Sequence, residues 1–494
     1  MNYKMVGFVL GRIFLIEAAL MLFPMGCAAI YGEWSVVLSF LWPALIVLAL
    51  GLITSLRTPQ NTKIYARDGL AIVALVWVLM SVFGALPFVI SGEIPSFADA
   101  FFETVSGFTT TGSTILTDVE ALSHGTLFWR SFSHWIGGMG ILVFLLAVLP
   151  LVGGSNMQLM KAESPGPSVG KLVPKVRFTA RILYVLYVAL TLLQVLVMLM
   201  GGMTLYEALC TSFGTAGTGG FGIYGDSIAR FSPFLQWAIT VFMIAFGVNF
   251  NVYFLLYMRR PKDALHCEEM HWYLGIIAAA ALLICVNAYD VTLTLENNLR
   301  QSFFQVASII TTTGFATTDF NLWPGFSHSI LVLLMFIGAC AGSTGGGLKV
   351  SRIVIGFKSV LTYLGAFLHP RAVRKVKFED KDVDAETMHA ICVYFIAAIG
   401  LFVISVLLVA LDGFDLVTTF SAVAATFNNI GPGLGVAGPT SNFAAFSDFS
   451  KVVMTMDMLL GRLEVFPMLM LFYPPLWKES IGEARIRRNR TALH

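Results

Sequence analysis

Four short turns rich in threonine and glycine are the stretches of this sequence with the most specific chemistry. At their tips they offer backbone carbonyls and no ionisable side chains. Carbonyl oxygens can replace the water around a cation, and glycine permits the backbone angles that direct successive carbonyls toward one axis. The turns therefore predict coordination of a cation, mainly by backbone. The residues expected to provide it are Thr110, Thr111, Gly112, Thr218, Gly219, Gly220, Thr312, Thr313, Gly314, Asn429, Ile430 and Gly431.

The unit that carries such a turn occurs four times. In its first copy an amphipathic segment, Pro95–Gly107, leads into the turn, and apolar runs long enough to cross a bilayer flank the unit. Recurrence at intervals of about 100 residues indicates an internally repeated fold. A helix that stops at a turn between two spans predicts a re-entrant loop, because non-helical backbone at membrane depth must be buried or line a water-filled path. Four such loops could form one ring, as in a pore with a four-part filter.

The four turns are unequal. Each keeps one aligned glycine and little else, whereas a tetrameric K⁺ channel repeats a longer TVGYG run four times. We therefore expect fewer ion sites and weaker discrimination among cations. Each re-entrant helix would also point the partial negative charge of its C-terminus at the bilayer centre, which favours a cation there.

A glycine-rich break interrupts the second apolar run of the third unit. The run from 325 to 358 holds 34 residues, about 51 Å of helix, which exceeds the hydrocarbon core. So many small and flexible residues predict an intramembrane loop below the turns that can move aside as a gate; the alternative is a kinked helix with small residues for close packing. The expected gate residues are Gly342, Ser343, Thr344, Gly345, Gly346, Gly347 and Lys349.

Arg462 lies within the last apolar run and is assigned to the same gate. An ionisable side chain inside a span is costly and indicates function by default. We expect it to face the ion path or the loop of the third unit. A structural ion pair with another helix is the alternative.

Composition places the chain among polytopic membrane proteins. It has 494 residues, 57% hydrophobic and 12% charged, where a soluble domain carries about 25% charged residues. Its six cysteines show no CxxC spacing, so neither a disulfide framework nor a zinc site is expected. The GxGxxG match at Gly217–Gly222 lacks the strand and helix of a dinucleotide fold, and the run Ser343–Lys349 lacks the GK[ST] of a phosphate loop. We expect neither an enzyme nor a cofactor bound to this chain.

The expected fold is all-α, with ten full spans: an N-terminal hairpin followed by four span–pore-loop–span repeats around one pore. The first span is read as uncleaved. The hairpin covers residues 1–57, the repeats cover 69–153, 179–258, 271–358 and 387–475, and a cytoplasmic tail covers 476–494.

Charge sets the expected orientation. With these spans, 26 of the 31 lysines and arginines fall on one side, so both termini are predicted to be cytoplasmic and the turns to open outside. The outer side carries 14 carboxylates against four basic residues, Arg130, Arg230, Arg300 and Lys451. A negatively charged pore entrance concentrates cations. The alternative is that these loops are polar only because they are exposed.

The four turns, together with WRSFSHWIGGMG (129–140), MQLMKAESPGP (157–167) and GRLE (461–464), resemble the Trk/Ktr superfamily of potassium-translocating subunits, and most closely its TrkH/TrkG type. The resemblance covers nearly the whole chain, including the first hairpin, which the KtrB type lacks. It implies potassium as the transported ion, with rubidium as a substitute, in a bacterial inner membrane. It also implies a homodimer with one pore per subunit, and a separate cytoplasmic regulatory subunit of the TrkA type that binds a nucleotide, NAD or ATP.

Two other functions compete with a gated potassium pathway. One is a potassium symporter coupled to H⁺ or Na⁺ that works by alternating access, which inverted repeats would favour. Here each repeat has an even number of spans, so all four share one orientation, which suits a pore. The other, a membrane scaffold or intramembrane enzyme, leaves the four glycine turns unexplained.

Overall fold

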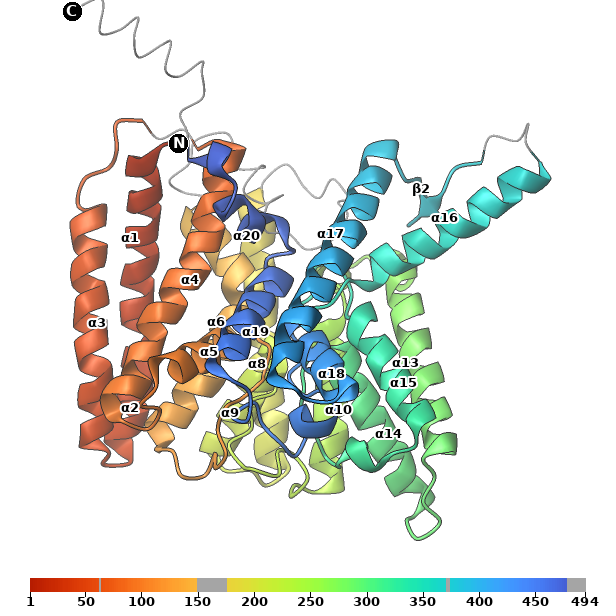
Figure 1. Ribbon diagram of the computed structural model, residues 1–494, viewed down its shortest axis with the longest axis horizontal. Coiled ribbons are helices and arrows are strands. Elements are labelled where there is room, and N and C mark those ends of the chain that lie inside the picture. The colour runs from red at the N-terminus through yellow and green to blue at the C-terminus, as the bar shows by residue number, and fades with distance from the viewer. Residues whose placement is uncertain (62–63, 149–175, 370–373, 478–494) are drawn as a thin grey trace, which may run out of the picture.

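The computed structural model describes residues 1–61, 64–148, 176–369 and 374–477. The described chain is helical apart from one small antiparallel pair, β1 (Lys377–Phe378) and β2 (Lys381–Asp382) (Figure 1). The expectation of an all-helical polytopic membrane protein is confirmed. Residues 149–153 of the first predicted repeat, the stretch 157–167 and the tail from residue 478 onward lie outside the described residues.

An N-terminal hairpin packs at one edge of the molecule, on the left in Figure 1. It consists of α1 (Tyr3–Leu20), α2 (Leu22–Ile30) and α3 (Trp34–Ser55). Helices α1 and α3 approach closely because each has a glycine facing the other helix. A Cβ on Gly11 would lie 2.1 Å from Oγ1 of Thr54, and one on Gly51 would lie 2.8 Å from Leu15. Small residues at such contacts are typical of helix pairs in membranes.

After the hairpin, a long helix followed by a short helix occurs four times, and each short helix ends in one of the threonine- and glycine-rich turns. Figure 1 shows these short helices in the lower half of the bundle. The long helices are α4 (Ala66–Ser91), α8 (Val176–Met200), α13 (Glu268–Asn287) and α17 (Ala385–Val409). The short helices are α5 (Phe97–Phe108), α9 (Leu205–Gly217), α14 (Leu295–Ile310) and α18 (Leu416–Phe427).

The chain then returns across the bundle after each turn. It does so through α6 (His124–Val148), α10 (Pro233–Gly247) with α11 (Phe250–Tyr257), α15 (Gly325–Ile337) with α16 (Val350–Leu368), and α19 (Asp448–Arg462) with α20 (Phe466–Leu471). Short elements complete the described chain: α12 (Pro261–Leu265), η1 (Phe320–Leu322), η2 (Ala410–Asp412), η3 (Gly435–Ala437) and η4 (Pro474–Leu476).

The sequence predicts ten full spans, and the described residues support that number only in part. Among the described residues, seven helices are long and apolar enough to cross a membrane, or eight if the bent pair α10 and α11 is one span. That pair bends by 88°, and a second break separates α19 from α20, where Glu464 and Val465 have φ of 53° and 68°. Only the break between α15 and α16 was predicted. The break between α10 and α11 lies in a stretch apolar enough for one span, and neither of these two breaks contains the glycine run that marks the third.

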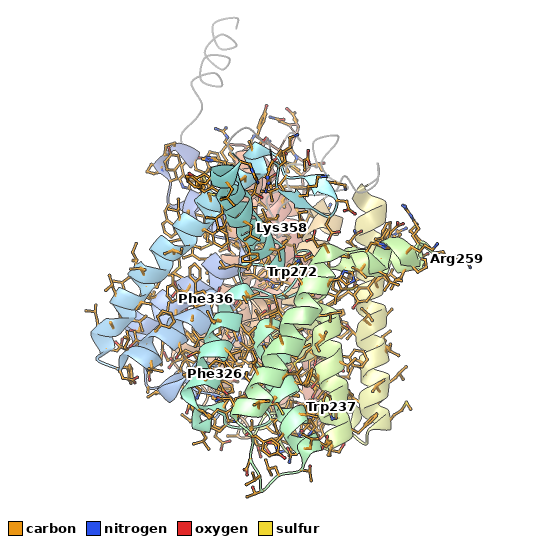
Figure 2. The ribbon with its side chains drawn as sticks, turned by 90° about the vertical axis from the view of Figure 1, so that its right-hand side faces the viewer. Trp237, Arg259, Trp272, Phe326, Phe336 and Lys358 are labelled. Carbon is orange, nitrogen blue, oxygen red and sulfur yellow. The ribbon has the colours of Figure 1, made fainter. Side chains whose placement is uncertain are left out.

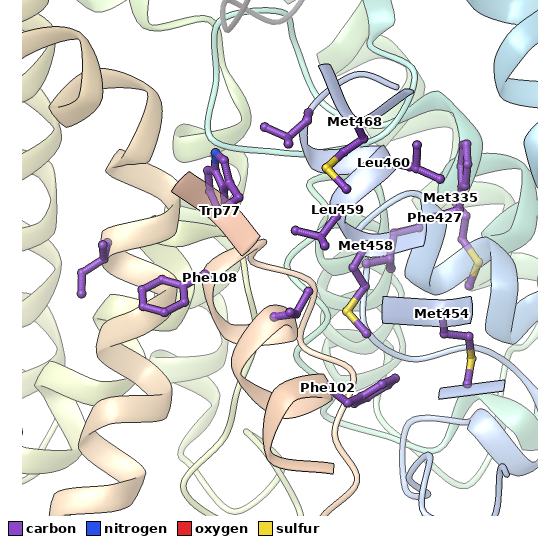
Figure 3. Packing of buried hydrophobic residues seen from close by; sticks show 14 of the residues in the cluster. Trp77, Phe102, Phe108, Met335, Phe427, Met454, Met458, Leu459, Leu460 and Met468 are labelled. Carbon is purple, nitrogen blue, oxygen red and sulfur yellow. The ribbon is translucent and has the colours of Figure 1, made fainter. Parts of the chain in front are cut away.

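The core and the surface share their apolar character, as expected for a chain solvated by lipid. Figure 3 shows Trp77 and Phe108 facing a methionine- and leucine-rich group that includes Met458 and Leu459 of α19. Long helices also expose apolar side chains outward, for example Leu196 of α8, which is 57% exposed. The lipid-facing and core-facing surfaces are therefore distinguished by packing rather than by polarity.

The two ends of the described chain lie together. The Tyr3 hydroxyl donates to the Trp477 carbonyl over 2.9 Å, and Figure 1 shows the N-terminus at the upper end of the bundle. Two segments project from the upper half of the bundle: α16 diverges from it in Figure 1, and the turn after α11 carries Arg259 outward in Figure 2.

Candidate cation-coordinating site

Each of the four short helices begins at a side-chain cap. Ser96, Thr204, Thr294 and Asp415 each accept a hydrogen bond from a backbone N–H of the first turn. The hydroxyl and backbone N–H of Thr418 lower the pKa of Asp415, so this cap remains ionised and complements the positive end of α18. The caps fix where the helices start, and hence where they end.

The four helices end in the same backbone geometry. A non-glycine residue adopts the left-handed conformation after each helix, with φ of 55° at Thr110, 55° at Thr218, 57° at Thr312 and 55° at Asn429. The next residue donates its N–H to a carbonyl five positions back over 2.8 to 2.9 Å, in the pattern of a Schellman cap. The donors are Thr111, Gly219, Thr313 and Ile430, and the acceptors are Ser106, Gly214, Ser308 and Ala425.

A second left-handed residue follows two positions later, and it is always the aligned glycine. The φ values are 83° at Gly112, 76° at Gly220, 86° at Gly314 and 105° at Gly431. Left-handed backbone favours glycine because it has no Cβ to clash. The four turns therefore share one backbone path despite their different sequences.

The turns meet in a closed ring, which we call the turn ring and define as Thr110–Ser113, Thr218–Phe221, Thr312–Phe315 and Asn429–Pro432. A Cβ on Gly112 would lie 2.0 Å from the Gly219 carbonyl oxygen, and one on Gly220 would lie 2.0 Å from that of Thr313. A Cβ on Gly314 would lie 2.2 Å from the Ile430 oxygen, and one on Gly431 would lie 2.9 Å from the Thr111 oxygen. Each glycine thus packs against the middle carbonyl of the next turn, in chain order and back to the first.

Hydrogen bonds join neighbouring turns on the side where the chain leaves them. Ser113 Oγ donates to the Gly431 carbonyl over 2.9 Å, and Phe443 N–H donates to Thr114 O over 2.8 Å. Beyond the second and third turns, Ile228 N–H donates to the Ala316 carbonyl over 3.0 Å. These bonds fix the turns to one another as well as to their own helices.

A buried ion pair braces the first two turns, and sequence reasoning missed it. Arg130 Nε lies 2.7 Å from Glu103 Oε1, and both side chains are almost fully buried. Glu103 also accepts from the hydroxyl of Thr114 and the N–H of Ile115, at 2.9 and 3.0 Å. Arg130 reaches the second turn through the Gly222 carbonyl at 3.1 Å. The count of outer charges identified both residues, but their pairing depends on packing between α5 and α6.

The other three basic residues of the predicted outer face are paired as well. The acceptors are Asp226 and Glu120 for Arg230, Glu296 for Arg300, and Asp99 for Lys451. Because each basic charge is neutralised by its own carboxylate, the remaining acidic residues dominate the charge of this face.

The glycine-rich segment lies directly against the third and fourth turns. Gly346 N–H donates to Thr312 Oγ1 over 2.6 Å, and Gly347 N–H donates to the Asn428 carbonyl over 3.2 Å. A Cβ on Gly345 would lie 2.9 Å from the Thr311 oxygen. The segment between α15 and α16 is non-helical, so the alternative of a merely kinked helix does not describe it.

Both basic residues assigned to the gate contact this segment. Lys349 Nζ donates to the carbonyls of Gly345 and Gly346. Arg462 donates to Thr344 O over 2.9 Å and to Gly137 O over 2.8 Å, so it bridges the segment and α6. A small cavity beside the segment is lined by Ser343, Gly345, Gly346, Lys349, Gly461, Arg462 and Glu464.

Glu269 holds the other end of the segment, and sequence reasoning missed this residue too. Its side chain is buried, and Oε1 accepts from the N–H of Ala341 over 2.7 Å and of Ser351 over 3.1 Å. The break between α10 and α11 contributes a further contact, from Phe250 N–H to the Gly342 carbonyl at 3.1 Å. No local motif marks Glu269, since its acceptor role exists only where three distant segments meet.

The chain as a whole is similar to known cation transport proteins. The family described as TrkH, cation transport protein, matches residues 37–284 and 272–479. The Trk system potassium uptake protein TrkH of Salmonella typhimurium is 37% identical over 493 residues, covering 97% of this chain and all of the relative. TrkG of Escherichia coli K12 is 32% identical, covering 97% of this chain and 99% of its own.

A solved structure agrees with these sequence relatives. The crystal structure of the potassium transporter TrkH from Vibrio parahaemolyticus superimposes with a TM-score of 0.87 at 32% identity, covering 97% of this chain and 100% of that one. The predicted resemblance to the TrkH/TrkG type is confirmed, and with it the expectation of a transport protein rather than an enzyme. The chain belongs to the TrkH family of cation transport proteins.

Proposed function

We propose that the chain carries potassium across the bacterial inner membrane and selects it in the turn ring, mainly through backbone carbonyls. The observation that carries this proposal is the closure of the ring: each aligned glycine meets the middle carbonyl of the next turn at a separation that excludes a Cβ. Carbonyls held so closely can replace the hydration shell of a cation. The sequence relatives are Trk system potassium uptake proteins, which supports potassium as the ion.

The fold surrounding the ring would then consist of the four repeats predicted from sequence, 69–153, 179–258, 271–358 and 387–475, arranged around one pore. The C-termini of α5, α9, α14 and α18 all end at the ring. Their partial negative charges would stabilise a cation without an anionic side chain. The acidic outer face would raise the local cation concentration.

The segment Gly338–Lys349 would be the gate of this path, and the conformation described here would be its closed state. Its glycines press against carbonyls of the third and fourth turns, and the cationic groups of Lys349 and Arg462 lie on the same side of the ring. Fixed positive charge next to a cation site raises the barrier to the ion. Opening would require the bonds to Thr312, Asn428 and Arg462 to break.

Control of the gate would come from outside this chain. We place both termini in the cytoplasm, consistent with the lysine and arginine asymmetry and with the adjacency of Tyr3 and Trp477. A cytoplasmic nucleotide-binding subunit of the TrkA type, acting on a homodimer, would then reach the end of the bundle from which α11 and α16 project.

Rubidium flux tests the proposal. The protein is reconstituted into vesicles, and uptake of radioactive rubidium is measured with excess potassium or sodium outside, with and without an imposed proton or sodium gradient. Stronger inhibition by potassium than by sodium, without a requirement for either gradient, is expected. Equal inhibition by both ions would overturn selection in the ring, and uptake that requires a gradient would replace the channel-like path by coupled symport.

A further inference from the structure

The second turn of the ring differs from the other three at its middle position. Thr111, Thr313 and Ile430 carry side chains there, whereas the second turn has Gly219. A Cβ on Gly219 would lie 2.2 Å from both Cγ and Nδ1 of His134. The imidazole of His134 therefore occupies the space that a side chain fills behind the other turns.

His134 comes from α6, which packs closely against the second unit. A Cβ on Gly217 would lie 2.2 Å from the His134 carbonyl oxygen, and one on Gly138 would lie 2.6 Å from Cα of Gly217. This close approach brings the imidazole directly behind the second turn, so a side chain at Gly219 has no room while His134 is present.

The imidazole also joins two quarters of the ring. Its Nδ1 lies 2.8 Å from the carbonyl oxygen of Gly107, in the last turn of α5, and its Nε2 lies 3.2 Å from the N–H of Phe221, which directly follows Gly220. The side chain is fully buried, and its ring packs on that of Phe221 with centroids 4.2 Å apart. His134 thus connects the end of the first short helix to the exit of the second turn.

These contacts require one tautomer. The N–H of Phe221 can only donate, so Nε2 must accept, and Nδ1 must carry the proton that goes to the Gly107 carbonyl. A second proton on Nε2 would place two donors face to face. The bridge therefore consists of one donor and one acceptor at fixed positions on a rigid ring.

We propose that His134 is a positioning residue for ion selection: its neutral imidazole takes the place of the side chain absent at Gly219 and holds the second turn in register with the first. The inference rests on the proposed function of the turn ring. The Gly219 carbonyl packs on Gly112, so a displacement of the second turn is transmitted to the first. Selectivity, rather than stability alone, should depend on the imidazole.

Three substitutions of His134 test its two hydrogen bonds and the volume of its imidazole separately. His134→Asn retains a donor near the Nδ1 position but loses the acceptor for Phe221. His134→Gln places an amide oxygen near the Nε2 position and keeps that acceptor. His134→Ala removes both and leaves the space empty, which adding Gly219→Ala to the same chain would partly refill.

The measurement is the ratio of potassium to sodium inhibition of rubidium uptake, per folded protein in vesicles. His134→Ala should lower the ratio by on the order of tenfold, because a buried backbone donor and a buried acceptor both lose their partner. His134→Gln should retain more of the ratio than His134→Asn, and the double variant should recover part of the loss. Gly219→Ala alone should be worse than the double variant, since it drives a Cβ into the imidazole.

His328 provides a matched control. Its Nε2 also lies near a backbone carbonyl, that of Phe320 at 2.7 Å, but on α15 away from the ring. His328→Ala should keep the ratio. Unchanged selectivity in folded His134→Ala would overturn the inference, as would equal losses in the Asn and Gln variants if His134→Ala does not fold. Gly314→Ala separates the role of His134 from the selectivity of the turn ring. If Gly314→Ala lowers the ratio and the His134 variants do not, only the role proposed for His134 is refuted. If Gly314→Ala also leaves the ratio unchanged, ion selection by the turn ring is refuted.

Discussion

Replacing Gly314 by alanine is the most direct perturbation of the turn ring. A methyl group there would lie 2.2 Å from the Ile430 carbonyl oxygen and 3.0 Å from Cδ of Pro432. Real Cβ atoms essentially never approach closer than 3.0 Å, so one of the two turns must move by at least 0.8 Å. Both neighbours are backbone or proline ring, which cannot rotate away as a long side chain can.

Two costs combine at this position. Alanine at φ of 86° adds about 1 to 2 kcal/mol of left-handed backbone strain. The displaced Ile430 carbonyl then no longer occupies its place beside the cation. A loss of about 1.4 kcal/mol in the preference for potassium corresponds to a tenfold lower selectivity, and a shift of most of an ångström in one carbonyl should cost at least that much.

Gly413 separates strain from crowding. It has φ of 78°, close to that of Gly314, but no atom lies within 4 Å of a Cβ built on it. Gly413→Ala should therefore reduce stability without altering selectivity. Gly431→Ala should fall between the two, because its nearest carbonyl lies at 2.9 Å rather than 2.2 Å.

The assay is rubidium uptake in vesicles with competing potassium or sodium, normalised to folded protein. Cells that depend on high-affinity uptake should also grow with Gly314→Ala only at raised potassium. If Gly314→Ala and Gly413→Ala retain the same selectivity and apparent affinity, the carbonyl at Ile430 does not coordinate the ion, and the reasoning from ring closure is refuted.

The remaining predictions concern the gate. Deleting Gly345–Gly347 removes the contacts with the third and fourth turns and should raise rubidium uptake and weaken its regulation; a folded variant with unmodified rate and control would contradict a gating role. If the positive charge forms the barrier, Arg462→Ala should raise uptake and Arg462→Lys should leave it nearly unchanged. Equal increases in both variants would instead assign the effect to loss of the hydrogen bonds from Arg462 to the carbonyls of Thr344 and Gly137. Glu269→Gln weakens two charge-assisted hydrogen bonds to the loop and should raise uptake several-fold; an unchanged rate in folded protein would exclude Glu269 as a latch.

The sequence alone was sufficient for features that depend on local composition. Apolar runs identified a polytopic helical protein, and the threonine- and glycine-rich turns located where the re-entrant helices end. Glycine marked the left-handed positions at Gly112, Gly220, Gly314 and Gly431, because few other residues tolerate that backbone. The same reasoning found the break between α15 and α16, where consecutive glycines destabilise any helix.

The tertiary structure decided what depends on distant segments coming together. The bend at Gly247–Asn249 lies in a stretch apolar enough for an unbroken span, and the break at Glu464–Val465 is not marked by a glycine run. Closure of the ring depends on contacts between turns that lie far apart in the chain, including the first and the fourth, and no local pattern specifies which of their groups touch. His134 and Glu269 carry no signal of their own, because a buried histidine or glutamate acquires its role only from the backbone groups that the fold places around it.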